Sequence, residues 1–190
     1  VHLESFVQGD WQQHEVEQFG EAIYKQISAI STPIAEAPRQ LIELTNRGTL
    51  IKEIANEQDD SAIIVYIQSA MADTRKVALF SLMNHFMAPQ YFAQIRTKQQ
   101  LGYLCGTSYM PINRHPGVML YIQSPVAGPK ELLAAVDDFL PQFIQYLEQL
   151  SPQQWQQGVE GLLTQVKSPD TSQRARAQRF WVSIGNRDYQ

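Results

Sequence analysis

A cation and a phenol stand seven positions apart in this chain, in the octet Arg96-Thr97-Lys98-Gln99-Gln100-Leu101-Gly102-Tyr103. The arginine is always protonated and offers a fork of N–H donors, and a neutral tyrosine hydroxyl can also donate. Two such groups can hold a peptide carbonyl or stabilise a developing oxyanion. Arginine and tyrosine are common residues, however, and a surface arginine beside a half-buried strand tyrosine would also explain the octet.

The octet lies between an expected helix and an expected hairpin. Apolar residues recur at helical spacing over residues 71–87, and Pro89 is expected to close that helix before the octet begins. Residues 103–110 and 117–124 predict the two arms of a β-hairpin. The octet therefore spans a helix-to-strand passage, where side chains can converge on one cleft. Gly102 is expected to allow close backbone approach where the strand begins.

The octet resembles the R-T-K-x-Q-L-G-Y signature in the C-terminal half of the insulinase/pitrilysin family of zinc metallopeptidases. The order of elements around it fits that family over residues 39–190. The resemblance implies an α+β domain in an enzyme whose two halves close over a peptide. It also implies that Arg96 and Tyr103 bind substrate: Arg96 would donate to a substrate carbonyl, and Tyr103 would hydrogen-bond the substrate or steady the oxyanion.

The same resemblance locates the catalytic zinc outside this chain. The family binds zinc through the inverted motif His-x-x-Glu-His, in which two histidines one helical turn apart ligate the ion. This chain has four histidines, none of which forms such a pair: His2, His14, His85 and His115. We therefore expect no metal site and no catalytic residue in this chain, and we expect zinc in the N-terminal half of the full-length protein.

Composition narrows the range of partners. The net charge is −4 with no basic stripe, which disfavours a general nucleic-acid binder. No apolar run approaches the ~20 residues of a membrane span. The single cysteine, Cys105, excludes an internal disulfide and leaves the redox compartment undecided. The localisation is therefore unknown, with bacterial periplasm or cytoplasm as the expectation. The expected partners are peptide substrates and the zinc-bearing N-terminal half of the same polypeptide.

The whole pattern predicts an α+β fold, an antiparallel sheet with helices packed on one face. Further strands are expected at residues 3–8, 40–44, 50–54 and 62–68, and further helices at 16–27, at 130–147, after Ser151 and after Thr171 or Ser172. The strand at 62–68 is apolar enough to be central. Prolines in 31–38 mark a boundary, so residues 1–38 are expected to end a preceding domain and residues 39–190 to form the C-terminal domain.

Three functions are compatible with these observations. The first is a substrate-enclosing, non-catalytic C-terminal domain of a large zinc peptidase. The second is a metal-free structural or assembly subunit of the same fold, which the intact octet disfavours because such a subunit needs neither Arg96 nor Tyr103. The third is a free-standing peptide-binding module, which rests on fold analogy alone. The chain begins in mid-pattern without Met, which argues against this third function.

Overall fold

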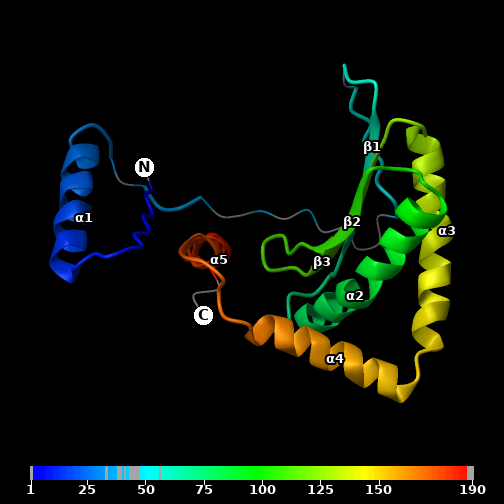
Figure 1. Ribbon diagram of the computed structural model, residues 1–190. Helices are drawn as coiled ribbons and strands as arrows, with labels where there is room; N and C mark the ends of the chain where they lie inside the picture. The colour runs from blue at the N-terminus through cyan, green and yellow to red at the C-terminus, as the bar shows by residue number, and fades with distance from the viewer. Residues whose placement is uncertain are drawn as a thin grey trace. The chain divides into compact units, whose positions relative to one another are not determined.

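The computed structural model describes residues 2–32, 34–37, 40, 42, 48–55 and 57–187. The chain divides into two compact units (Figure 1). One unit comprises residues 1–40 and 169–190, and the other comprises residues 41–168. Residues 169–190, which we expected in the C-terminal domain, thus group with the N-terminal residues. The assignment of both segments to domains of a longer protein stays a prediction.

The larger unit is built on a three-stranded antiparallel sheet. Its strands are β1 (Ser61–Gln68), β2 (Leu104–Tyr109) and β3 (Gly117–Ser124), in the order β1-β3-β2. The predicted hairpin is therefore present, and β3 is the central strand. The expectation that 62–68 would be central is wrong for the described strands, because β1 borders their sheet, and one face of β1 is open, since Ile64 is 69% exposed. A continuous apolar run does not reveal how many of its faces are buried.

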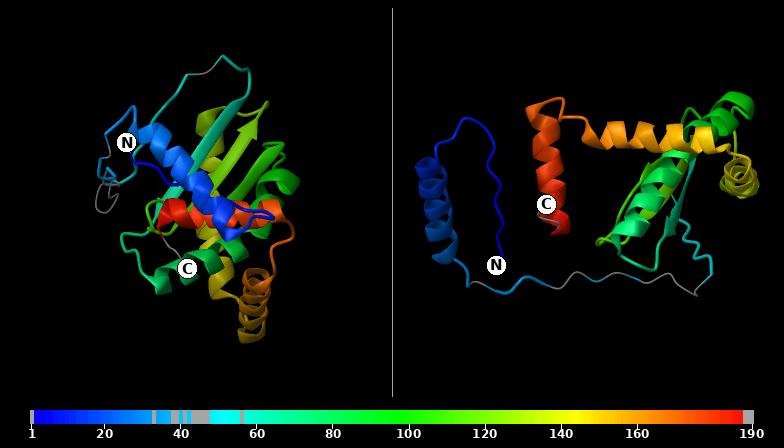
Figure 2. Two further views of the ribbon diagram at one scale, coloured as in Figure 1. Left: turned by 90° about the vertical axis from the view of Figure 1, so that its left-hand side faces the viewer. Right: turned by 90° about the horizontal axis from the view of Figure 1, so that it is seen from below.

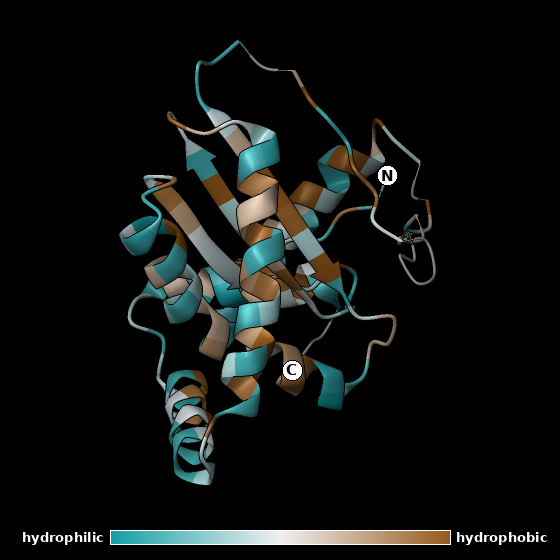
Figure 3. Ribbon diagram, turned by 90° about the vertical axis from the view of Figure 1, so that its right-hand side faces the viewer, coloured by the Kyte–Doolittle hydropathy of each residue, from teal (hydrophilic) through white to brown (hydrophobic). Residues whose placement is uncertain are grey.

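Helices cover one face of this sheet, as predicted. They are α2 (Thr74–Phe92), which packs against β2, and α3 (Pro129–Glu148), which packs against β1, while α4 (Pro152–Lys167) packs on α2. Figure 3 views the sheet from the side of α3, and the left view of Figure 2 is taken from the opposite side. The core between sheet and helices includes Met87, Tyr91, Val118, Leu120, Ile122, Leu132, Val136 and Phe139.

The helix before the octet does not end at Pro89, contrary to our expectation. Pro89 lies inside α2, and the helix continues directly into a π-helical turn, η1 (Ala93–Lys98). Proline removes one N–H donor and crowds the preceding turn, but packing against the sheet retains the helix. In the π-turn the bonds span one residue more than in an α-helix, as the 3.0 Å bond from Gln99 N to Gln94 O shows. Arg96 therefore belongs to a helix and not to a loop.

The predicted helix starts are confirmed at two serines. Ser151 precedes α4 and accepts a hydrogen bond from Gln154 N, and Ser172 precedes α5 (Gln173–Asn186) and accepts from Ala175 N. Helix α1 (Gln13–Ser28) confirms the helix expected at 16–27. Each serine oxygen satisfies an N–H group that the first helical turn leaves unpaired.

Two of the expected strands are absent from the described residues. Residues 3–8 and 50–54 have no strand structure, and most of the strand expected at 40–44 lies outside the described residues. Their apolar residues satisfied a local pattern, but a strand forms only where a neighbouring strand supplies hydrogen bonds. In the described part of the chain, no helix has the combination of length and hydrophobicity that crossing a bilayer requires.

Candidate functional site

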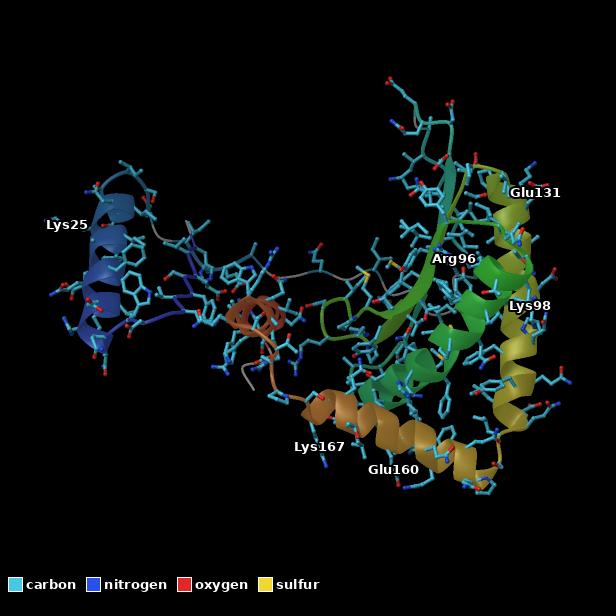
Figure 4. All side chains as sticks on the ribbon, viewed as in Figure 1. Lys25, Arg96, Lys98, Glu131, Glu160 and Lys167 are labelled. Carbon is cyan, nitrogen blue, oxygen red and sulfur yellow. The ribbon has the colours of Figure 1, made fainter. Side chains whose placement is uncertain are left out.

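Arg96 and the Tyr103 backbone meet at one end of the sheet. Arg96 lies in the last turn of η1, Tyr103 directly precedes β2, and the Arg96 guanidinium donates through Nη1 to the backbone carbonyl of Tyr103. The same guanidinium lies 5.5 Å from the centroid of the Phe92 ring, within the range of a cation–π contact. Figure 4 labels Arg96 together with Lys98, the other cation of η1. The end of η1 is thus in contact with the start of β2, whereas the convergence of the Arg96 and Tyr103 side chains on one cleft stays a prediction.

The Tyr103 side chain makes a second set of contacts. Its hydroxyl donates to Asp60 Oδ2 at 2.6 Å, and Gln123 Nε2 donates to the same oxygen at 3.0 Å. The strand register explains the meeting: Ser61 pairs with Ser124 and Leu104 pairs with Gln123, so residues flanking all three strands lie at one end of the sheet. We call Asp60, Arg96, Tyr103 and Gln123 the Tyr103 cluster.

Tyr103 is exposed to solvent, yet its neighbour Asp60 changes the pKa of its hydroxyl. Tyr103 is 51% exposed. The hydrogen bond to the Asp60 carboxylate raises the pKa of the Tyr103 hydroxyl, and a small loss of solvation and the charge of Asp60 add to the effect. The hydroxyl is therefore neutral at physiological pH and directs its only proton at Asp60. Its lone pairs remain available to accept a hydrogen bond.

Gly102 permits the approach of the octet to the central strand. A Cβ atom at this position would lie 2.5 Å from the backbone oxygen of Gln123 and 2.8 Å from Cγ2 of Ile122. Any other residue would push the start of β2 away from β3, which agrees with the predicted close backbone approach. Gln100, two residues earlier, has a φ of 55° and turns the chain from η1 toward β2.

Sequence reasoning found half of this cluster. Arg96 and Tyr103 were predicted, whereas Asp60 and Gln123 were not. Asp60 comes 43 positions before Tyr103 and Gln123 comes 20 positions after it, so only the strand register brings them together. An acidic residue immediately before a predicted strand was the single available signal. Cys105 is buried, and burial raises the pKa of its thiol, while the Arg96 charge opposes that shift.

The contacts described for His2, His85 and His115 are with other residue types. His115 Nδ1 lies 3.2 Å from the backbone oxygen of Ser69, a structural contact. Within the described ranges, one group has ligand atoms close enough to share an ion, namely His2, Glu4 and Glu36, whose atoms lie within 4.8 Å of one another. Glu36 is also paired with the Arg187 guanidinium, so a cation already occupies one carboxylate of this group. The group lies in the unit of residues 1–40 and 169–190, separate from the Tyr103 cluster's unit.

Comparison with known proteins relates this chain to one family. Residues 82–181 match the family described as PQQ synthase PqqF-like, C-terminal lobe domain 4. That match covers more than half of the chain and contains Arg96, Tyr103 and Gln123.

Individual relatives agree with that match. A nardilysin-like protein of Arabidopsis thaliana is 26% identical over 140 residues, which are 72% of this chain and 14% of that protein. Insulin-degrading enzyme of Homo sapiens is 24% identical over 149 residues, 78% of this chain and 14% of the enzyme. The crystal structure of pitrilysin superimposes with a TM-score of 0.59 at 22% identity, covering 69% of this chain and 14% of pitrilysin. The chain thus spans about one seventh of the length of these relatives.

Proposed function

Because the chain belongs to the insulinase/pitrilysin family, with a domain of the kind found in its non-catalytic C-terminal lobes, we propose that it encloses and positions peptide substrate for a zinc peptidase. The zinc site would be carried by an N-terminal half of the same polypeptide. These 190 residues contain no His-x-x-Glu-His sequence, so we assign no step of metal chemistry to them.

The observation that supports this proposal most directly is the convergence of Arg96 and Tyr103 at a solvent-exposed end of the sheet. A half-exposed tyrosine and an exposed arginine add little to a hydrophobic core. They are nevertheless bonded to each other and, through Tyr103, to Asp60. An exposed but ordered polar constellation on a rigid sheet and helix is what binding of a peptide main chain requires.

Each of the two residues has a role that its geometry permits. The contact to the Tyr103 carbonyl involves one terminal nitrogen of Arg96, and the other N–H groups of the guanidinium fork can bind a substrate carbonyl. The fixed position of Tyr103 allows its hydroxyl to meet the same substrate. Zinc, when bound in the other half, would supply an activated water for hydrolysis. The residues described here would hold the peptide in register with it.

The test uses the complete polypeptide that carries this domain. Arg96→Ala is expected to lower turnover of a quenched fluorescent peptide by about 10²–10³-fold, the effect of removing one preorganised donor from a closed site. Tyr103→Phe removes the hydroxyl that meets the same substrate and is also expected to lower turnover. Metal analysis should find the same zinc content in both variants and in the unchanged protein. Lys98→Ala is the matched control, because Lys98 is an exposed cation of the same π-turn and should leave turnover normal.

Near-normal turnover in both variants would exclude the substrate-positioning role. A complete polypeptide that neither binds zinc nor cleaves peptides would instead support a structural or assembly subunit. In that case Arg96→Ala and Tyr103→Phe should be examined for loss of complex formation.

A further inference from the structure

We propose that Asp60 is a positioning residue that acts through Tyr103: it takes the only proton of the hydroxyl and thereby makes Tyr103 an acceptor for a substrate main-chain N–H. The inference rests on the proposed function and specifies what the site recognises. It concerns Asp60, a residue that lies outside the octet and outside the segment matched to the family.

Tyr103 is held at both of its ends. The guanidinium of Arg96 binds its backbone carbonyl, and Asp60 accepts from its hydroxyl at 2.6 Å. Asp60 is itself fixed by Gln123, which donates to the same carboxylate oxygen at 3.0 Å. A tyrosine side chain that is 51% exposed would otherwise exchange between rotamers in nanoseconds or less. The Arg96 contact holds the backbone of Tyr103, and the bond to Asp60 selects one orientation of the ring before any substrate arrives.

The direction of the hydrogen bond follows from the chemistry of the two groups. A phenol has one proton to donate and two lone pairs, whereas an ionised carboxylate can only accept. The proton between Tyr103 and Asp60 therefore belongs to the tyrosine and points at the carboxylate. What remains on Tyr103 is acceptor capacity, and donation to a substrate carbonyl or oxyanion would first require breaking the bond to Asp60.

An acceptor at Tyr103 complements the donor at Arg96. An extended peptide presents N–H and C=O groups along its edge, as a strand does to a neighbouring strand. Arg96 can bind a carbonyl and Tyr103 can bind an N–H, so the pair matches the polarity of a peptide main chain without requiring a particular side chain. This arrangement predicts that the site recognises peptide backbone in preference to peptide sequence.

The activity test compares three single variants of the complete polypeptide. Asp60→Ala should lower kcat/KM by about three- to tenfold, the equivalent of one solvent-exposed hydrogen bond to a charged group. Asp60→Asn keeps an acceptor oxygen and should recover part of that loss. Asp59→Ala removes the same charge from the adjacent exposed residue and should leave kcat/KM unchanged.

A double variant shows whether Asp60 acts through Tyr103. Once Tyr103→Phe has removed the hydroxyl, adding Asp60→Ala should cause no further loss, because the two residues contribute as one unit. Two losses that multiply independently would overturn the inference. So would a normal kcat/KM in Asp60→Ala when Tyr103→Phe alone is strongly impaired.

A titration tests the same bond without any activity. NMR of protein carrying tyrosine labelled at the ring Cζ follows each hydroxyl, and the Tyr103 signal is identified by its disappearance in Tyr103→Phe. Asp60→Ala should lower the pKa of Tyr103 toward the ordinary tyrosine range, whereas Asp59→Ala should not. An unchanged Tyr103 titration in Asp60→Ala overturns the inference, while normal turnover of Tyr103→Phe overturns the proposed function.

Discussion

Both faces of the sheet carry apolar residues, but helices cover one face while residues of the other are exposed. On the face toward α2 and α3, Val118, Leu120 and Ile122 of β3 are at most 1% exposed. On the opposite face, Ile64 of β1 is 69% exposed and Leu104 of β2 is 50% exposed. The register places both on the same face as Gln123 of the Tyr103 cluster. The open face therefore adjoins the candidate site, and exposed apolar surface of this kind commonly marks a binding surface.

The largest expected effect separates the two faces directly. Ile122→Ala on the covered face should lower the free energy of unfolding by about 2–5 kcal/mol, because it leaves a cavity between β3 and the helices. Ile64→Ala removes the same atoms from the open face and should cost under about 1 kcal/mol. Urea denaturation followed by circular dichroism measures both. Equal losses would mean that the open face is covered in solution.

The next largest change in stability is expected at Gly102, in the octet just before β2. Gly102→Ala should cost about 1–3 kcal/mol, because its Cβ would collide with the backbone of Gln123 and with Ile122. Gly20→Ala in α1 is the matched control, since nothing lies within 4 Å of that position. The control should raise stability by about 0.5–1 kcal/mol through helix propensity. A neutral Gly102→Ala would show that β2 can move away from β3.

The smallest effect compares a tyrosine hydroxyl on each side. Tyr91 lies wholly inside the covered core, against Phe139, and its hydroxyl has no hydrogen-bond partner among the residues that the structure describes. Tyr91→Phe should therefore raise the free energy of unfolding by about 1 kcal/mol. Tyr103→Phe, at the exposed cluster, should change it by no more than about 0.5 kcal/mol. Thermal denaturation at neutral pH distinguishes these two outcomes.

The same tyrosine predicts a dependence on alkaline pH. Burial raises the pKa of the Tyr91 hydroxyl far above the ordinary value, with smaller contributions from Cys105 and Tyr121. Above about pH 10 the unfolded chain releases this proton while the folded chain retains it, so stability should fall as pH rises. Tyr91→Phe removes that contribution, and its stability should decline less steeply between neutral pH and pH 11. Identical slopes in the two proteins would contradict a buried neutral hydroxyl.

The helices and the hairpin were predictable because their signals are local. Helical spacing of apolar residues and capping serines at 151 and 172 depend only on neighbours in sequence. The strands expected at 3–8 and 50–54 failed for the complementary reason, since alternation is local but pairing is not. The π-turn was also unpredictable, because a proline that ends one helix is tolerated in another whose faces are packed.

The residues of the candidate site also differ in whether a local sequence signal could predict them. Arg96 and Tyr103 could be predicted because a short motif contains both of them. Asp60 and Gln123 could not, since their proximity depends on which residues of β1, β2 and β3 lie opposite one another. A shift of one residue in that register would turn Gln123 to the other face, and Asp60 would lose the hydrogen bond from Gln123.

Strand β1 has one further consequence, which concerns association in solution. Among the described residues it pairs only with β3, so its other edge presents backbone N–H and C=O groups without partners in that part of the chain. Its residues, Ser61–Gln68, include no charge and no proline, two features by which natural edge strands resist pairing with a further strand. The domain isolated at high concentration should therefore aggregate edge to edge, and a lysine at the outward-facing Ile64 should keep it dispersed.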